Sequence, residues 1–226
     1  MNSKLFLQAI IKYLLGIILC GALIFIPAGT LNFWNGWLFM AALFIPMFFA
    51  GILMMVKNPQ LLASRLNAKE EENEQKTVMV LSGIMFIAGF LICGLNYRFG
   101  WMVMPKGVVI GGTVVFLLAY VLYGEVLREN AYLSRTIEVQ EGQTVVDTGL
   151  YGIVRHPMYA VTVVLFLAIP VILGSVHALI IFLVYPFILA KRIGNEEKVL
   201  EENLEGYREY KKKVKYRMIP FVWYIF

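Results

Sequence analysis

Long apolar runs dominate this sequence and restrict the chain to a membrane fold. Of the 226 residues, 60% are hydrophobic and only 15% are charged, whereas soluble domains carry roughly 25% charged residues. A helix needs about 20 mostly apolar residues to cross a bilayer. Segments that reach or approach this length are 5–26, 34–56, 77–97, 108–127, 157–173 and 176–190. We therefore expect an all-α, polytopic membrane helix bundle of about six segments.

The first segment is long for a signal peptide, and the last two are short for membrane spans. Segment 5–26 is longer than the roughly 7–15 apolar residues of a signal peptide, so we interpret it as a transmembrane helix. Segments 157–173 and 176–190 are short, and only Gly174 and Ser175 separate them. They predict a C-terminal helical hairpin in which Pro157 opens one arm and Pro186 kinks the other. Whether both arms cross the bilayer fully stays open.

The basic residues predict the orientation in the membrane. If the N-terminus is cytoplasmic, 18 of the 20 lysines and arginines fall on the cytoplasmic side, and only Arg98 and Lys106 lie outside. Such a bias is typical of cytoplasmic loops. We expect an integral protein of a bacterial or archaeal cell membrane with both termini in the cytoplasm. The net charge of +5 follows from this topology and requires no nucleic acid partner.

Two cytoplasmic pieces can carry chemistry, so we divide the chain into a membrane region, 1–127, and a catalytic region, 128–226. In the first piece, residues 135–149 carry β-branched residues between glycines and predict a small two-stranded excursion. In the second, an apolar stripe predicts one cytoplasmic amphipathic helix from Asn195, its N-cap, to Lys213. A short interfacial helix is predicted at 61–67.

The stretch RHPMY, residues 155–159, places charge where the chain enters the hairpin. Pro157 at the first helical position makes His156 the N-cap. The unpaired N–H groups of a helix N-terminus, together with Arg155 and His156, form a donor-rich pocket that suits an anion or a carboxylate. Tyr159 adds a ring and a hydroxyl group. The alternative is that Arg155 and His156 only anchor the helix at lipid headgroups.

A carboxylate pair, Glu196 and Glu197, follows the last apolar segment. Arg192 precedes Glu196 by four residues and can share its helix face. Such a pair can hold ribose hydroxyls or an amino group. The cysteines, Cys20 and Cys93, lie in apolar runs and are expected to be packing residues. No metal site and no Gly-rich phosphate loop is expected.

Three motifs of the last hundred residues form a compound pattern: RHPMY (155–159), RIGNEEKVL (192–200) and GYREYKKKVKYRMIP (206–220). From Arg128 onward the chain resembles the isoprenylcysteine carboxyl methyltransferase family. It is also similar to the related phospholipid N-methyltransferases and, more distantly, to membrane sterol reductases. One departure is Val161, where many members have glycine. A branched side chain there narrows the space for a bulky prenyl group.

The resemblance implies that S-adenosylmethionine binds on the cytoplasmic face. The positions that match the family's cofactor site are Gly149, Tyr151, His156, Pro157, Tyr159, Glu196 and Glu197. The positions expected to be catalytic are Arg192, Arg155 and Asn130, and either arginine could steer an acceptor carboxylate.

The function expected is therefore methyl transfer to a lipid-borne or apolar small-molecule acceptor in the membrane. Carboxyl O-methylation of an acceptor such as an isoprenylcysteine comes first, and phospholipid or amine N-methylation comes second. A sterol-type reductase using NADPH and a non-catalytic membrane scaffold are further alternatives.

Overall fold

The computed structural model of the chain describes residues 3–66, 73–133 and 139–220. In these ranges the secondary structure is helical, with one isolated bridge between Val103 and Ser175 and no strand. The helices are α1 (Ser3–Ala28), α2 (Trp34–Lys57), α3 (Pro59–Leu66), α4 (Asn73–Phe99), α5 (Lys106–Glu129), the 3-10 turn η1 (Gly149–Gly152), α6 (Pro157–Ile172), α7 (Val176–Phe182), α8 (Tyr185–Asn203) and α9 (Tyr207–Lys213). The predicted all-α bundle is confirmed.

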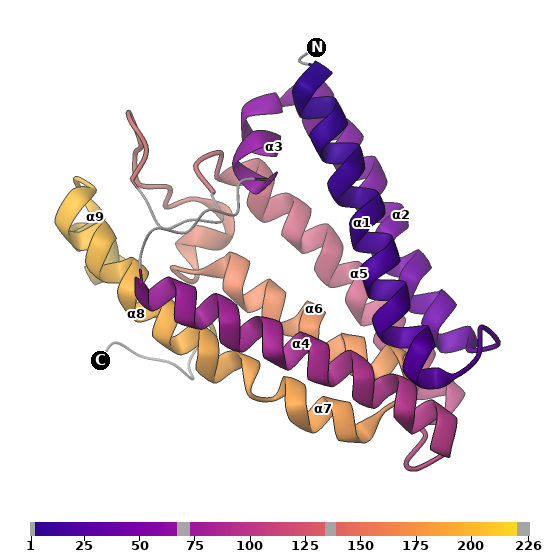
Figure 1. Cartoon of the computed structure of the whole chain (residues 1–226). Coiled ribbons are helices and arrows are strands. Elements are labelled where there is room, and N and C mark those ends of the chain that lie inside the picture. Colours follow the sequence, from indigo (N-terminus) through magenta and orange to yellow (C-terminus); the bar gives the residue numbers. More distant parts are fainter. Residues whose placement is uncertain (1–2, 67–72, 134–138, 221–226) are drawn as a thin grey trace.

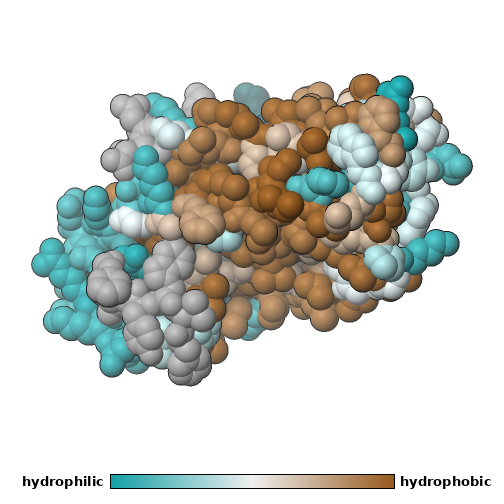
Figure 2. All heavy atoms as spheres, turned by 90° about the horizontal axis from the view of Figure 1, so that it is seen from below, coloured by the Kyte–Doolittle hydropathy of each residue, from teal (hydrophilic) through white to brown (hydrophobic). Residues whose placement is uncertain are grey.

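Five stretches are long and apolar enough to cross a membrane: Ser3–Ala28, Trp34–Lys57, Lys76–Phe99, Lys106–Glu129 and Val176–Asn203. The chain is an integral membrane protein. Helix α6 has 16 residues, or about 24 Å, which is shorter than the roughly 30 Å hydrocarbon core of a bilayer. Figure 2 shows hydrophobic residues over the centre of the molecule and hydrophilic ones gathered at the end that carries α9. We call this the charged end.

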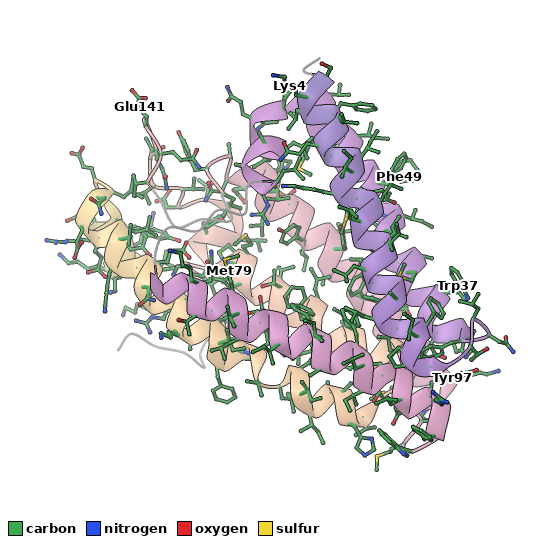
Figure 3. All side chains as sticks on the ribbon, viewed as in Figure 1. Lys4, Trp37, Phe49, Met79, Tyr97 and Glu141 are labelled. Atoms are coloured by element: carbon green, nitrogen blue, oxygen red, sulfur yellow. The ribbon has the colours of Figure 1, made fainter. Side chains whose placement is uncertain are left out.

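The helices form two arms that diverge toward the charged end (Figure 1). Helices α1 and α2 make one arm, and α4 lies along α7 and α8 in the other, with α5 and α6 between them. The arms meet at the opposite end, where Trp37 and Tyr97 lie, far from Glu141 in Figure 3. There Trp37 Nε1 donates to the Leu31 carbonyl over 2.8 Å, and the Tyr97 hydroxyl donates to the Asn32 carbonyl over 2.5 Å.

The hairpin turn forms where the sequence predicts it. Gly174 has a φ of 76°, a conformation that costs glycine little, and Ser175 caps α7 by accepting a hydrogen bond from the Ala178 N–H. The prediction that Pro186 kinks a continuous helix is wrong. Instead α7 ends at Phe182 and α8 begins at Tyr185, with Pro186 in its first turn, where a missing N–H leaves no intrahelical bond unmade.

The predicted amphipathic helix from Asn195 to Lys213 is wrong in its bounds. Helix α8 continues without interruption from the apolar segment through Asn195 to Asn203, so Asn195 is no N-cap. The break comes at Gly206, whose φ of 81° starts α9. The apolar face of α9, Tyr207 and Tyr210, packs against Leu204, Val214, Val139 and Val145 of the same chain rather than standing alone.

The loop after α5 also differs from expectation. Residues 139–148 contain no strand, and a turn at Gly142, with a φ of 72°, occupies the predicted hairpin; residues 134–138 lie outside the described ranges. Side-chain bonds hold this turn: Gln140 Nε2 donates to the Tyr132 carbonyl, and the Gln140 N–H donates to Gln143 Oε1. A helix is present where one was predicted at 61–67: it is α3, Pro59–Leu66, and residue 67 lies outside the described ranges. That this helix lies at the membrane interface stays a prediction. The proposed division at 127/128 stays a prediction.

Helices α1 and α4 pack so closely that a glycine is required between them. A Cβ at Gly94 would lie 2.6 Å from the Ile24 carbonyl oxygen and 2.9 Å from the Ala28 nitrogen. Both are backbone atoms, so neither can turn aside. Along the same helix, Gly83 has nothing within 4 Å of an added Cβ. The two glycines therefore form a matched pair for a test of this packing.

We predict that Gly94→Ala lowers the melting temperature of the detergent-purified protein, because relieving the overlap must push α1 and α4 apart at a cost of about 1–3 kcal/mol. Gly83→Ala should leave it unchanged or raise it slightly, since alanine favours a helix. Thermal unfolding followed by circular dichroism measures both. Equal melting temperatures for the two variants would contradict the packing described.

Candidate functional site

A pocket lies at the charged end, where α6, α8 and α9 meet the turn η1 and the loop residues 130–133 and 143–146. Residues predicted from the sequence make up much of its wall: Asn130, Tyr151, Arg155, His156, Tyr159, Arg192 and Glu196. Three predicted residues, Gly149, Pro157 and Glu197, do not line it. The structure thus brings together positions from 130 to 196 that the sequence connects through motifs alone.

The RHPMY motif enters the pocket as the start of α6. Pro157 occupies the first turn and His156 the N-cap, as predicted, but His156 makes no side-chain capping bond. The C-terminal segment holds the motif in place instead. The Arg155 N–H donates to the Tyr216 carbonyl over 2.9 Å, and the His156 N–H donates to the Arg217 carbonyl over 2.8 Å. Backbone bonds therefore fix the first turn of α6 against the residues after α9.

Glu197 sits behind the pocket wall as the centre of a buried charge cluster. Its side chain is 3% exposed. It accepts from Arg155 Nε over 2.7 Å, from His156 Nε2 over 3.2 Å and from Arg217 over 3.1 Å, and Lys211 Nζ lies 3.7 Å away. Because a carboxylate only accepts, this contact fixes the proton of His156 on Nε2. From this location, Glu197 can hold the side chains of Arg155 and His156 in position. That Glu197 contacts a cofactor stays a prediction.

Glu196, one residue earlier, faces the pocket. The Tyr159 hydroxyl donates to Glu196 Oε2 over 2.5 Å, and Arg192 Nε donates to the Tyr159 oxygen over 2.9 Å. His156 Nδ1 lies 4.0 Å from Glu196 Oε1, and the rings of His156 and Tyr159 are stacked 5.7 Å apart. Arg192, Tyr159 and Glu196 thus form a hydrogen-bonded chain along one wall. This chain leaves Glu196 Oε1 directed toward His156.

The opposite wall comes from the end of α5 and the turn η1. Asn130 is the C-cap of α5, and its Oδ1 accepts from the Tyr132 N–H over 3.0 Å. Tyr151 is buried, and its carbonyl accepts from the Tyr210 hydroxyl over 2.7 Å. Gly149 supports this turn from outside the pocket: its φ is 49°, and an added Cβ would collide with the Glu129 carboxylate.

Sequence reasoning missed most of the residues contributed by the loop and by α9. Tyr132, Gln143, Tyr207 and Tyr210 line the pocket, together with the apolar side chains Leu133, Val145, Val146, Met158, Leu200 and Leu204. Tyr207 and Tyr210 belong to the quoted motif GYREYKKKVKYRMIP, so a signal was present for these two residues. Taking the motif as one surface helix concealed it, because the turn of the chain at Gly206 brings Tyr207 back to the pocket.

A second missed residue comes from the N-terminal half. Arg65 on α3 donates to the Tyr123 hydroxyl on α5, and its Nη1 lies 3.8 Å from Sδ of Met158, which lines the pocket. Lys12 of α1 in turn donates to the Leu66 carbonyl over 2.5 Å. These contacts tie α3 across the bundle to the edge of the pocket. No motif distinguishes Arg65 in the sequence.

Three buried polar atoms have no hydrogen-bond partner among the described residues: Arg155 Nη2, the Tyr207 hydroxyl oxygen and Asn195 Nδ2. Arg155 and Tyr207 belong to the pocket wall. Burial raises the pKa of Tyr207 well above its ordinary value, so its phenol stays protonated at neutral pH. Across residues 3–66, 73–133 and 139–220, no group of three His, Cys, Asp or Glu side chains could hold a metal ion.

Comparison with known families finds a match to the region that contributes most of this pocket. The sequence model of the isoprenylcysteine carboxyl methyltransferase (ICMT) family matches residues 109–202. Over this part, the chain is similar to the ICMT family. The match runs from α5 through α8 and includes the RHPMY motif and Glu196. It supports a membrane methyltransferase and confirms the resemblance drawn from the motifs.

A curated relative comes from a different enzyme class. The chain is 32% identical over 91 residues to a Delta(14)-sterol reductase of Mus musculus. The match covers 39% of this chain and 22% of the reductase, so the chain aligns with less than a quarter of that protein's length. The similarity agrees with the more distant resemblance to sterol reductases.

Removing the charge of Glu197 should destabilise the charged end. We predict that Glu197→Gln lowers the free energy of unfolding by about 3–5 kcal/mol, because it leaves buried Arg155 without its counter-ion. Glu201→Gln, on the same helix, is the control: Glu201 pairs with Lys211 at a partly exposed site, where a pair contributes at most about 1 kcal/mol. Melting curves in detergent compare the two variants. An equal shift for both would show that Glu197 is no more important than a surface carboxylate.

Proposed function

We propose that the chain is an integral membrane methyltransferase that uses S-adenosylmethionine and methylates the carboxyl group of a lipid-borne or apolar acceptor, such as an isoprenylcysteine. The observation that carries the proposal is the pocket itself. Motif residues of the ICMT region line it, and it lies where the apolar bundle meets the charged end. Such a place admits a polar cofactor from water and an apolar acceptor from the bilayer.

The residues present suit the cofactor. S-adenosylmethionine carries a positive sulfonium, an ammonium, a carboxylate and a ribose diol. The pocket offers the Glu196 carboxylate as an acceptor and partner for positive charge. Arg155 Nη2 and the Tyr207 hydroxyl are donors without a partner among the described residues. Apolar side chains such as Leu133 and Val146 can cover an adenine ring. The charged groups and the adenine ring of the ligand thus have counterparts in the wall.

When bound, S-adenosylmethionine supplies an electrophilic methyl group for in-line displacement. The chain's part is to align the acceptor oxygen at about 3–3.5 Å and to exclude water. Arg192 is placed to orient an acceptor carboxylate, because it lines the pocket one helical turn nearer the apolar bundle than Glu196. Arg155 is less suited, since Glu197 and two backbone carbonyls already occupy its guanidinium. Asn130 faces the same space.

The nature of the acceptor follows from its surroundings. A carboxylate needs no base, so O-methylation requires orientation alone, whereas an amine acceptor must lose a proton, for which Glu196 is available. Val161 is buried in α6, 7% exposed, and is not part of the pocket lining. We infer that the acceptor is a lipid-linked carboxylate, with phospholipid or amine N-methylation as the alternative. The membrane is inferred to be that of a bacterial or archaeal cell, with the charged end and both termini in the cytoplasm.

A second candidate function rests on the similarity to the Delta(14)-sterol reductase. A reductase would bind NADPH in the same pocket and use it to reduce an apolar substrate. The two readings differ in the ligand and therefore in the binding experiment. A non-catalytic scaffold would bind neither.

We predict that the detergent-purified protein binds S-adenosylmethionine and S-adenosylhomocysteine saturably in calorimetric titration and does not bind NADPH. His156→Ala and Glu196→Gln should weaken binding at least tenfold, because one removes a ring from the pocket wall and the other removes its negative charge. Glu205→Gln is the control, since Glu205 lies outside the pocket on the exposed turn before α9.

Each variant is first checked for folding by its melting curve. Binding of NADPH with no adenosyl binding would favour the reductase. If the folded protein bound none of the three ligands, both the methyltransferase and the reductase hypotheses would be wrong.

A further inference from the structure

Arg155 is a buried guanidinium with one nitrogen unused. Its Nε donates to Glu197 over 2.7 Å, and its Nη1 donates to the carbonyls of Val214 and Lys215 over 2.7 and 2.9 Å. Nη2 has no partner among the described residues, although the side chain has 0% of its surface exposed. A buried donor without an acceptor is destabilising. The hydrogen bonds that hold Arg155 in place use Nε and Nη1, and they do not explain why Nη2 has no acceptor.

Tyr207, on α9, is a second residue of the pocket lining whose buried donor is unused. The residue is 4% exposed, and its hydroxyl has no partner within the described ranges. Its neighbour Tyr210, one turn along α9, is equally buried, but the Tyr210 hydroxyl donates to the Tyr151 carbonyl over 2.7 Å. The two tyrosines of α9 thus differ in their hydrogen bonding: the Tyr210 hydroxyl bonds to the backbone, and the Tyr207 hydroxyl has no partner among the described residues.

The two unused donors belong to residues that line the same pocket, Arg155 at the start of α6 and Tyr207 at the start of α9. A guanidinium N–H and a phenol O–H together match a group with two acceptor oxygens and a negative charge, which is a carboxylate. Glu196, in the same pocket, offers the complementary negative charge for an ammonium group. An amino acid moiety presents these two groups on one carbon.

We propose that Arg155 Nη2 and the Tyr207 hydroxyl form a carboxylate-binding subsite, and that it takes the carboxylate of the S-adenosylmethionine amino acid moiety. The assignment deepens the proposed function and rests on it. The cofactor is favoured over the acceptor because Tyr207 belongs to the α9 cluster at the charged end, beyond the apolar part of α8. An acceptor that enters from the bilayer meets Arg192 first.

The test compares S-adenosylmethionine with its decarboxylated analogue, which keeps the sulfonium, the amine and the adenosine. The wild-type protein should bind S-adenosylmethionine about ten- to a hundredfold more tightly, since hydrogen bonds to a charged group are the strong ones. Tyr207→Phe should lose roughly tenfold for S-adenosylmethionine and nothing for the analogue. Tyr97→Phe is the control outside the pocket: it loses the bond from its hydroxyl to the Asn32 carbonyl, so it should lower the melting temperature but keep the wild-type ratio of the two affinities.

The outcomes separate this subsite from the proposed function. If folded wild-type protein binds neither adenosyl ligand, the proposed function fails and this assignment fails with it. If both bind and Tyr207→Phe leaves their ratio unchanged, the subsite is wrong while the function stands. A third arm titrates an S-prenylated N-acetylcysteine and its methyl ester. Selective loss of the free acid in Tyr207→Phe, with S-adenosylmethionine unaffected, would place the acceptor's carboxylate at these donors and overturn the assignment.

Discussion

One buried carboxylate joins the parts that build the pocket. Glu197 on α8 binds Arg155 and His156, which begin α6, and Arg217, which follows α9. Arg155 and His156 lie 42 and 41 residues before Glu197 in the sequence, and Arg217 lies 20 residues after it. Burying a carboxylate is costly unless it is paired, so the cluster can persist only with all three elements docked. The geometry of the pocket therefore depends on an interaction that is not itself in the pocket.

This arrangement separates two tasks within the chain. The apolar helices provide a membrane platform, and close contacts such as Gly94 against α1 hold it together by packing. At the charged end the forces are polar, because loops and helix ends must satisfy backbone groups and charges. Arg155 shows this clearly, since it binds a carboxylate and two carbonyls at once. The geometry of the pocket thus depends mainly on the short C-terminal elements, which the apolar bundle supports.

Sequence reasoning worked where one residue determines the local geometry. Pro157 fixes the start of α6 and therefore the place of His156, and Gly174 with Ser175 fixes the hairpin turn. It was weaker for Glu196 and Glu197. Neighbours on a helix point about 100° apart, so one faces the pocket and the other the cluster. Which is which depends on the rotation of α8 against α6, and the pattern of residues does not contain that angle.

The tail shows a different limit. The apolar stripe of 195–213 is real, but it belongs to two helices, because α8 continues past Asn195 and Gly206 turns the chain. Hydrophobic periodicity reports the spacing of apolar residues along the chain. It does not show where the chain changes direction between two helices. Tyr207 was consequently assigned to a surface when it lies in the pocket wall. Arg65 could not be predicted from the sequence, because its contacts are with residues far along the chain.

The most direct measurement is ultraviolet cross-linking of radiolabelled S-adenosylmethionine to the purified protein, with the labelled peptides mapped by mass spectrometry. We predict saturable labelling, displaced by S-adenosylhomocysteine and not by NADPH. The label should fall on peptides that carry the pocket-lining residues of 130–133, 143–159 and 192–210. Displaceable label confined to α1, α2 or α4, or label displaced by NADPH alone, would contradict it.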